Sequence, residues 1–157
     1  ITMVKDSLFA SKIISYAQGF SLISLVGKQQ NWNLNLAGIA KIWRGGCIIR
    51  ARFLSDISDA FRKNPELSNL MIDSVFASIL KNCQSNLRAV VSLGVLNGIP
   101  IPALSASLSY YDSFRSERLP ANLLQAQRDF FGAHGYERLD AEEGKLFHTE
   151  NWPSLVD

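Results

Sequence analysis

The stretch RDFFGAH, residues 128–134, holds the pair of side chains best suited to bind an anion. Arg128 lies near the end of a predicted helix, and His134 follows just past the glycine that ends it. A guanidinium can bind two phosphate oxygens at once, and an imidazole adds a donor of shorter reach. The two side chains could therefore converge on one phosphate. In the alternative interpretation, which helix-end chemistry alone favours, Arg128 satisfies the last carbonyls of its own helix and His134 merely caps it.

Motifs for other chemistry are absent from the sequence. It contains no G-x-G-x-x-G loop for a dinucleotide, no P-loop and no G-x-S-x-G nucleophile turn. A serine triad would need a histidine, and both histidines, His134 and His148, lie in or beside the C-terminal tail. We therefore predict no catalytic residue and no cofactor-binding residue within this chain.

The acidic and sulfur-containing residues do not suggest a metal site. Asp140, Glu142 and Glu143 belong to a predicted turn that is exposed to solvent. Cys47 and Cys83 lie far apart, and the two histidines cannot complete a zinc site with plausible spacing. We expect both cysteines to be free, buried thiols of a cytoplasmic protein.

Length and composition are those of one globular domain. Of the 157 residues, 47% are hydrophobic and 19% are charged. A compact fold of this size buries roughly 70% of the surface that its unfolded chain exposes. The net charge is only +2, and the densest basic run, residues 44–52, has three arginines among apolar neighbours. These features argue against a nucleic-acid partner.

The first predicted helix runs from Asp6 to about Val26. Its apolar residues do not form one stripe but extend most of the way round the helix. A helix that is apolar all round must be buried on all sides. A chain of this size could hardly enclose it alone, so we infer a partner surface outside this chain.

Capping residues and breakers predict the remaining helices. The expected helices are Asn35–Arg44, ended by Gly45-Gly46; about Ile48–Arg62, stopped by Asn64-Pro65; one from Asp73 as N-cap through Leu93; one from the Pro100–Pro102 turn to Arg118; and one from Pro120 through Phe131. The uncharged stretch Ala89–Tyr111 is nominally long enough for a bilayer, which needs about 20 residues. Its two prolines favour a turn between buried helices, so we predict no membrane span.

The last 25 residues, 133–157, differ in character from the helical part. The strings YERL, residues 136–139, and KLFH, residues 145–148, flank an acidic turn and predict a small hairpin. This tail has too few apolar residues for a core of its own, so it either frays or lies on another surface, and its aromatic residues favour the second. The predicted fold is all-α, with a helical domain over residues 1–132 and an extended tail with a small β-hairpin over residues 133–157.

Several longer strings together are typical of one family. They are ASKIISYAQGF (10–20), WNLNL (32–36), IWRGGCIIR (42–50), NPEL (64–67), GIPIPA (98–103), YYD (110–112), RSERLPANLLQAQRDFFGAH (115–134), YER (136–138) and FHTE (147–150). The family that these strings resemble is the enzyme family 6-phosphogluconate dehydrogenase. The resemblance covers about residues 6–152.

The resemblance implies a part of a larger enzyme. In the family this segment is the second half of a large all-helical domain, which follows a Rossmann domain that binds NADP and a helical stretch with the catalytic lysine and glutamate. The family oxidises 6-phosphogluconate at C3 with hydride transfer to NADP and then decarboxylates it to ribulose 5-phosphate, in the pentose phosphate pathway and in gluconate utilisation. Because neither the Rossmann domain nor the catalytic pair is present here, we expect this chain alone to be inactive.

The resemblance also implies a role for the tail. Family members are cytoplasmic homodimers in which the tail threads through the partner subunit. An arginine and a histidine of the R-D-x-F-G-A-H motif then complete the partner's substrate site. On this match Arg128 and His134 are ligands of 6-phosphogluconate, and NADP is bound by the domain that is absent here.

The sequence departs from the family at three places. Gly135 stands where the family usually has threonine, Asn151 looks inserted before Trp152, and the tail lacks the glycine-rich extension of some members. Two other functions remain as alternatives: a stand-alone, non-catalytic helical dimerisation module and, ranked last, a helical binder of a small ligand.

Overall fold

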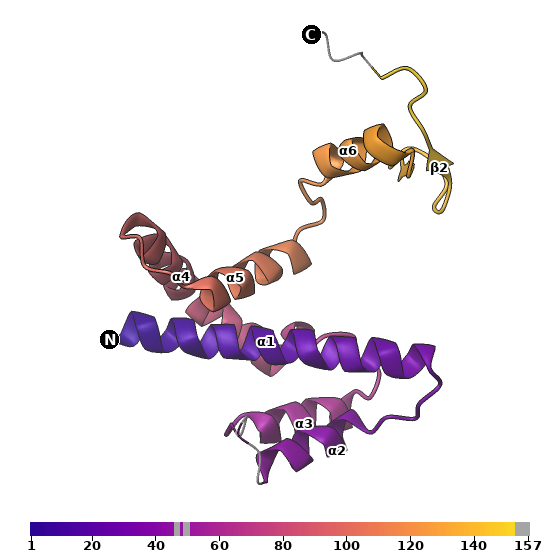
Figure 1. The fold of residues 1–157 in the computed structure, drawn as a ribbon. Coiled ribbons are helices and arrows are strands. Elements are labelled where there is room, and N and C mark those ends of the chain that lie inside the picture. Colours follow the sequence, from indigo (N-terminus) through magenta and orange to yellow (C-terminus); the bar gives the residue numbers. More distant parts are fainter. Residues whose placement is uncertain (46–47, 49–50, 153–157) are drawn as a thin grey trace. The chain divides into compact units, whose positions relative to one another are not determined.

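The computed structural model describes residues 1–45, 48 and 51–152, and it divides into two compact units, Ile1–Phe114 and Arg115–Asp157. We call them the N-terminal and C-terminal units. Within the described residues the elements are α1 (Thr2–Gln29), α2 (Leu36–Arg44), α3 (Leu54–Lys63), the 3-10 helix η1 (Leu70–Ile72), α4 (Ser74–Leu96), α5 (Pro102–Phe114), α6 (Asn122–Gly132), β1 (Tyr136–Glu137) and β2 (Leu146–Phe147) (Figure 1). The all-α prediction is confirmed, and so is the small hairpin. The predicted division after residue 132 stays a prediction.

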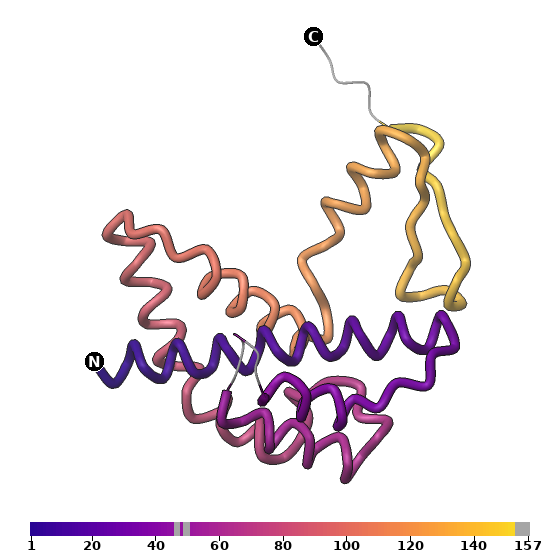
Figure 2. The backbone as a smooth tube through the Cα atoms, turned by 60° about the horizontal axis from the view of Figure 1, so that its bottom comes forward, coloured from indigo at the N-terminus to yellow at the C-terminus, as the bar shows by residue number. Residues whose placement is uncertain are grey.

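The N-terminal unit is built on α1. This helix packs against α4, α5 and η1, while α2 pairs with α3 (Figures 1 and 2). Phe20 of α1 joins the two groups, because its ring centroid lies 5.1 Å from that of Trp43 on α2 and 5.2 Å from that of Phe61 on α3. The fully buried large apolar side chains of this core are Ile13, Ile14, Phe20, Leu54, Ile57, Leu70, Phe76, Leu80 and Leu87.

Helix α1 carries apolar side chains on more than its buried side, as the sequence predicts. One side of the helix, which includes Ile13, Ile14 and Phe20, is buried in the core. Apolar side chains elsewhere on the helix remain exposed, namely Met3, Val4, Leu8, Phe9, Leu22 and Leu25. By length and composition alone α1 could also cross a membrane, a property that core helices of soluble proteins share. The exposed apolar side chains therefore leave α1 with surface that a partner could bury.

Two of the predicted helix starts are confirmed by cap hydrogen bonds. The Asn35 side chain accepts a bond from the Gly38 N–H at 2.9 Å. Asp73 Oδ1 accepts from the N–H groups of Val75 and Phe76 at 3.0 and 3.4 Å. Each cap satisfies backbone donors that the first turn of a helix leaves free.

Several predicted helix boundaries are wrong. Helix α1 runs from Thr2 to Gln29 rather than from Asp6 to about Val26. Helix α3 begins at Leu54 rather than near Ile48, because the buried Phe53 enters the core from a turn. Helix α5 ends at Phe114 rather than Arg118, since residues 115–118 offer no apolar side chain to pack. Pro120 lies two residues before α6 instead of in its first turn.

A short element that the sequence did not predict, η1, is held by one buried amide. Asn69 donates from its side-chain nitrogen to Ser21 Oγ at 2.9 Å and to Tyr110 Oη at 3.2 Å. Its side-chain oxygen accepts from the Met71 N–H at 2.9 Å. Asn69 thus ties η1 to α1 and α5.

The cysteine prediction holds in part. Cys83 on α4 is a free thiol, but it is half-buried rather than buried. Its burial, together with the nearby charge of Asp6, raises the pKa of the thiol, which disfavours the reactive thiolate. Cys47 lies outside the described residues.

Replacing Phe20 with alanine should destabilise the N-terminal unit by about 3–5 kcal/mol, because it leaves a cavity between three helices. The ring is 1% exposed. Urea denaturation followed by circular dichroism measures the change in the free energy of unfolding. The matched control is Gln18→Ala on the exposed side of α1, which should change it by less than about 0.5 kcal/mol. Equal effects of the two variants would contradict a core centred on Phe20.

Candidate functional site

The predicted anion-binding residues flank the C-terminal end of α6. Gly132 is the last helical residue, and Ala133 follows in the left-handed conformation with φ of 49°. The Ala133 N–H donates to the Asp129 carbonyl oxygen at 2.8 Å. The residue that turns the chain out of the helix is therefore Ala133, and the prediction that Gly132 is the cap is wrong by one position.

Gly132 instead makes room for the imidazole of His134. A Cβ atom at position 132 would lie 2.7 Å from His134 Nε2 and 2.9 Å from Cδ2. Carbon atoms in real proteins essentially never approach this closely. The imidazole therefore lies against the helix end, and a Cβ atom at position 132 would require it to move.

Asp129 is the only buried residue among the described part of the C-terminal unit, with 1% exposure. Its Oδ1 accepts from the Gly135 N–H at 3.1 Å and from His148 Nδ1 at 2.8 Å. Its Oδ2 accepts from the Thr149 N–H at 3.0 Å. Burial by itself raises the pKa of this carboxyl, but the three donors outweigh it, so the pKa lies below its ordinary value. Asp129 is therefore a charged carboxylate that links α6 to both ends of the hairpin.

The hairpin itself is short and largely exposed. Strands β1 and β2 are antiparallel, with Tyr136 opposite Phe147 and Glu137 opposite Leu146. Glu137 accepts a hydrogen bond from the Gly144 N–H at 2.8 Å, which closes the acidic turn. All three acidic residues of that turn are exposed, as predicted.

Gly135, a departure from the family pattern, suits its position. Its φ is 72°, in the left-handed region, and a Cβ there would lie 3.2 Å from the Phe147 carbonyl oxygen. Glycine adopts this conformation without steric cost, whereas threonine would be strained. The loop between α6 and β1 is thus adapted to glycine in this chain. Asn151, the second departure, is exposed beyond the hairpin.

Arg128 and His134 are both exposed, and both lie close in sequence to Asp129. Within the described ranges 1–45, 48 and 51–152, no hydrogen bond or ion pair engages either side chain. Neither residue is therefore used to cap α6, which removes the support for the helix-end interpretation. Their convergence on one anion stays a prediction.

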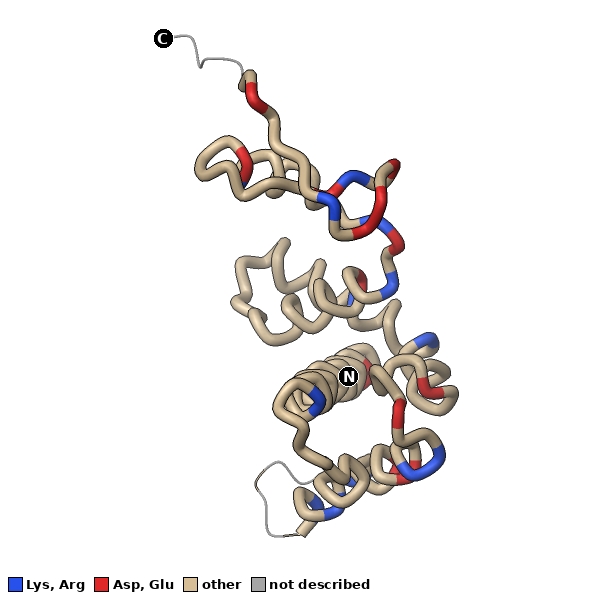
Figure 3. The backbone as a smooth tube through the Cα atoms, turned by 90° about the vertical axis from the view of Figure 1, so that its right-hand side faces the viewer, with Lys and Arg blue, Asp and Glu red and all other residues tan. Residues whose placement is uncertain are grey.

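In the part of the chain that the structure describes, the basic residues do not gather at one place. Lysine and arginine positions are scattered along the backbone among acidic ones (Figure 3). Several of the described arginines are already paired with carboxylates, among them Arg62 with Asp59, Arg88 with Asp112 and Arg138 with Asp140. Among the described residues, no group of three or more histidine, cysteine, aspartate or glutamate side chains could hold a metal ion.

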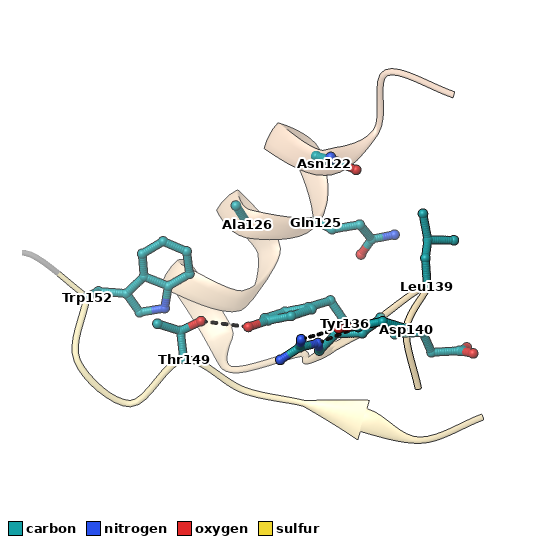
Figure 4. A pocket seen from close by; sticks show the side chains of 10 residues that line it. Asn122, Gln125, Ala126, Tyr136, Leu139, Asp140, Thr149 and Trp152 are labelled. Carbon is teal, nitrogen blue, oxygen red and sulfur yellow. Dashed lines mark hydrogen bonds and ion pairs between the residues drawn. The ribbon is translucent and has the colours of Figure 1, made fainter. Parts of the chain in front are cut away.

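A hollow of the C-terminal unit is lined by neither Arg128 nor His134. It has a volume of about 400 Å³ and lies between α6 and the hairpin (Figure 4). Its lining residues are Asn122, Gln125, Ala126, Tyr136, Glu137, Arg138, Leu139, Asp140, Thr149 and Trp152. Tyr136 Oη and Thr149 Oγ1, 2.9 Å apart, share a hydrogen bond at its wall. Neither residue of the predicted pair lines this hollow, so it is a different feature from the predicted anion site.

The sequence analysis missed Asp129, His148 and Thr149 as structural partners, although they lie within the matched strings. A signal was present. The carbonyl end of a helix carries partial negative charge, so an aspartate in the last turn is unfavourable there. Its presence indicates other donors that offset the repulsion, and here these are two backbone N–H groups and an imidazole.

These features define a helical domain that carries an exposed arginine and histidine at the end of its last helix. Residues 1–152 match the family model described as 6-phosphogluconate dehydrogenase, C-terminal domain. The chain therefore belongs to the 6-phosphogluconate dehydrogenase family, as its C-terminal domain.

Curated relatives agree with this assignment. The chain is 58% identical to 6-phosphogluconate dehydrogenase, decarboxylating, of Ceratitis capitata over 95% of this chain and 31% of the relative. It is 55% identical to the human enzyme of the same name, over 95% of this chain and 30% of the relative. It is 53% identical to the NADP(+)-dependent decarboxylating enzyme of Bacillus subtilis, over 96% of this chain and 32% of the relative.

The fold is also that of a solved member of the family. Plasmodium falciparum 6-phosphogluconate dehydrogenase, determined in its apo form, with its cofactor NADP+ and with its substrate 6-phosphogluconate, matches with a TM-score of 0.88 and 47% identity. The match covers 95% of this chain and 32% of that one. The chain thus spans about a third of the length of the relatives that it matches.

The Asp129 hydrogen bonds should be lost in acid. Because the pKa of Asp129 is lower in the folded unit than in the unfolded chain, its stabilising contribution is complete above about pH 4 and is lost as the pH falls through the lowered value. The amide resonances of Gly135 and Thr149 in nuclear magnetic resonance spectra should shift together over that range. In Asp129→Asn this joint titration should vanish, and a titration that persists in the variant would assign it to another group.

Proposed function

We propose that this chain is the C-terminal domain of an NADP-dependent, decarboxylating 6-phosphogluconate dehydrogenase. The whole enzyme converts 6-phosphogluconate to ribulose 5-phosphate and CO2, in the pentose phosphate pathway and in the cytoplasm. The proposal is supported by the names of relatives that match 95% or more of this chain. The observation that carries it is the intact RDFFGAH motif, whose arginine and histidine are exposed at a helix end and make no hydrogen bond or ion pair with any residue that the structure describes.

Arg128 and His134 are the substrate ligands in this proposal. The guanidinium binds two oxygens of the substrate phosphate in its planar fork, and the imidazole binds beside it. NADP, held by the domain outside this chain, accepts the hydride. The contribution of this chain is to bind and orient the phosphate end of the substrate.

The exposed apolar surface supports a homodimer. In the C-terminal unit, Leu139 is 86% exposed and Phe131 is 74% exposed, while the buried residue is a carboxylate. A unit with so little apolar burial is stabilised only weakly by the hydrophobic effect. In the N-terminal unit, the exposed apolar side chains of α1 are a second surface suited to a partner. We infer that a second copy covers both surfaces and that the tail crosses to the partner's substrate site.

Polar substitutions on the hairpin should weaken the dimer. Leu139→Ser and Leu146→Ser together remove exposed apolar side chains without touching the hydrogen bonds of Asp129. Obligate interfaces bury on the order of 2,000–5,000 Å², so loss of two such contacts should raise the dimer dissociation constant about tenfold or more. Light scattering of the full-length enzyme across micromolar concentrations measures this. Glu143→Ser, in the exposed turn of the same hairpin, is the control and should leave the mass unchanged.

Arg128→Ala tests the proposed function. A charge-assisted hydrogen bond contributes about 1.5–3 kcal/mol, so the full-length variant should bind 6-phosphogluconate roughly 10- to 150-fold more weakly. Arg128→Lys should recover only part of this loss, because an ammonium offers one point of charge instead of a fork. The affinity for NADP should barely change.

The comparison of the two affinities is decisive. The control is Arg62→Ala, which removes an exposed arginine of α3. Arg62 forms only a surface ion pair with Asp59, three residues earlier on the same helix. This variant should alter neither the affinity for 6-phosphogluconate nor that for NADP. If Arg128→Ala changes both constants equally or changes neither, Arg128 is a structural residue and the substrate assignment is wrong.

A further inference from the structure

The backbone on each side of His134 is hydrogen-bonded to Asp129. On its N-terminal side the Ala133 N–H donates to the Asp129 carbonyl oxygen at 2.8 Å. On its C-terminal side the Gly135 N–H donates to Asp129 Oδ1 at 3.1 Å. Both neighbours of His134 are thus fixed to Asp129, and Gly132 leaves the space into which the imidazole folds.

The same carboxylate also holds the far end of the hairpin. His148 Nδ1 and the Thr149 N–H donate to it at 2.8 and 3.0 Å. The returning strand is therefore fixed against the helix end that carries Arg128 and His134. With Oδ1 accepting two bonds and Oδ2 one, a charged carboxylate satisfies all three donors.

From this geometry we propose that Asp129 is the positioning residue that holds His134 in its substrate-binding orientation. The inference rests on the proposed function, because it takes His134 to be a substrate ligand. Asp129 does not itself touch the substrate, since its side chain is buried and its acceptors are occupied. It acts by holding residues 133–135 in one conformation before the substrate binds. Substrate binding then does not have to order this loop.

The substitution Asp129→Asn separates positioning from mere packing. The asparagine side chain has nearly the same shape as aspartate. Its amide nitrogen is itself a donor, so it cannot accept the hydrogen bonds that the donors of residues 135, 148 and 149 make to the carboxylate. In the full-length enzyme, Asp129→Asn should raise the dissociation constant of 6-phosphogluconate about tenfold. The dissociation constant of NADP should stay the same. Asp140→Asn, the same substitution in an exposed pair of the same unit, is the control and should change neither.

A double-mutant cycle shows whether Asp129 acts through His134. If the carboxylate works by orienting the imidazole, then Asp129→Asn should weaken substrate binding less than about twofold in a His134→Ala background. A general structural role predicts instead that the two losses add. Should Asp129→Asn not yield folded enzyme, His148→Ala removes one donor and leaves the bonds to Gly135 and Thr149. It should give a smaller loss that also disappears in the His134→Ala background.

The outcomes separate this inference from the proposed function. If His134→Ala alone leaves substrate affinity unchanged, His134 is not a ligand, and both the proposed role of His134 and this inference are wrong. If His134→Ala weakens substrate binding but Asp129→Asn has no effect, or adds its full loss to the double variant, only the positioning role is overturned. Selective loss of substrate affinity without additivity supports it.

Discussion

The C-terminal unit depends on one buried charge, the carboxylate of Asp129. Most small structures are held by apolar side chains, yet here the buried residue of the described part is ionised. A buried carboxylate must be matched by donors. Those donors come from residues 135, 148 and 149, so a single side chain fixes the two ends of the tail segment 135–149 to the helix that precedes it.

Apolar contacts complete the unit without giving it a core. Trp152 packs edge-on against Phe130 with 5.7 Å between ring centroids, and Arg138 and Lys145 lie over the ring of Phe147. These contacts lie at the surface, and several large apolar side chains beside them remain in solvent. The N-terminal unit differs, because Phe20 and its neighbours bury a continuous core, although apolar side chains of α1, α4 and other elements remain exposed.

The sequence predicted the elements whose causes are local. Asn35 and Asp73 each cap a helix through bonds within three residues, and the hairpin follows from its turn and flanking aromatics. What the sequence analysis missed has causes of two kinds. Helix α5 ends at Phe114 because residues 115–118 offer no apolar side chain to pack. The element η1 exists because Asn69 binds Ser21 and Tyr110, which are 48 and 41 positions away in the sequence. Local propensity cannot encode such contacts.

The candidate site was predicted in the same uneven way. The motif identified Arg128 and His134. An aspartate in the last turn of a helix indicated that Asp129 has donors nearby, but not that two of them are residues 19 and 20 positions further along the chain. Helical geometry explains why the three residues take different roles. Successive side chains on a helix point about 100° apart, so Arg128 faces solvent while Asp129 faces the hairpin.

This arrangement also keeps the arginine available. An aspartate next to an arginine is an obvious ion-pair partner, and such a pair would neutralise the guanidinium before any phosphate arrived. Here both oxygens of Asp129 are already bound to donors from the tail, and the pKa of the carboxyl is lowered by those donors rather than by Arg128. The Asp129 carboxylate is therefore occupied by the donors of the tail and does not pair with Arg128. The guanidinium of Arg128 thus retains its capacity to bind an anion.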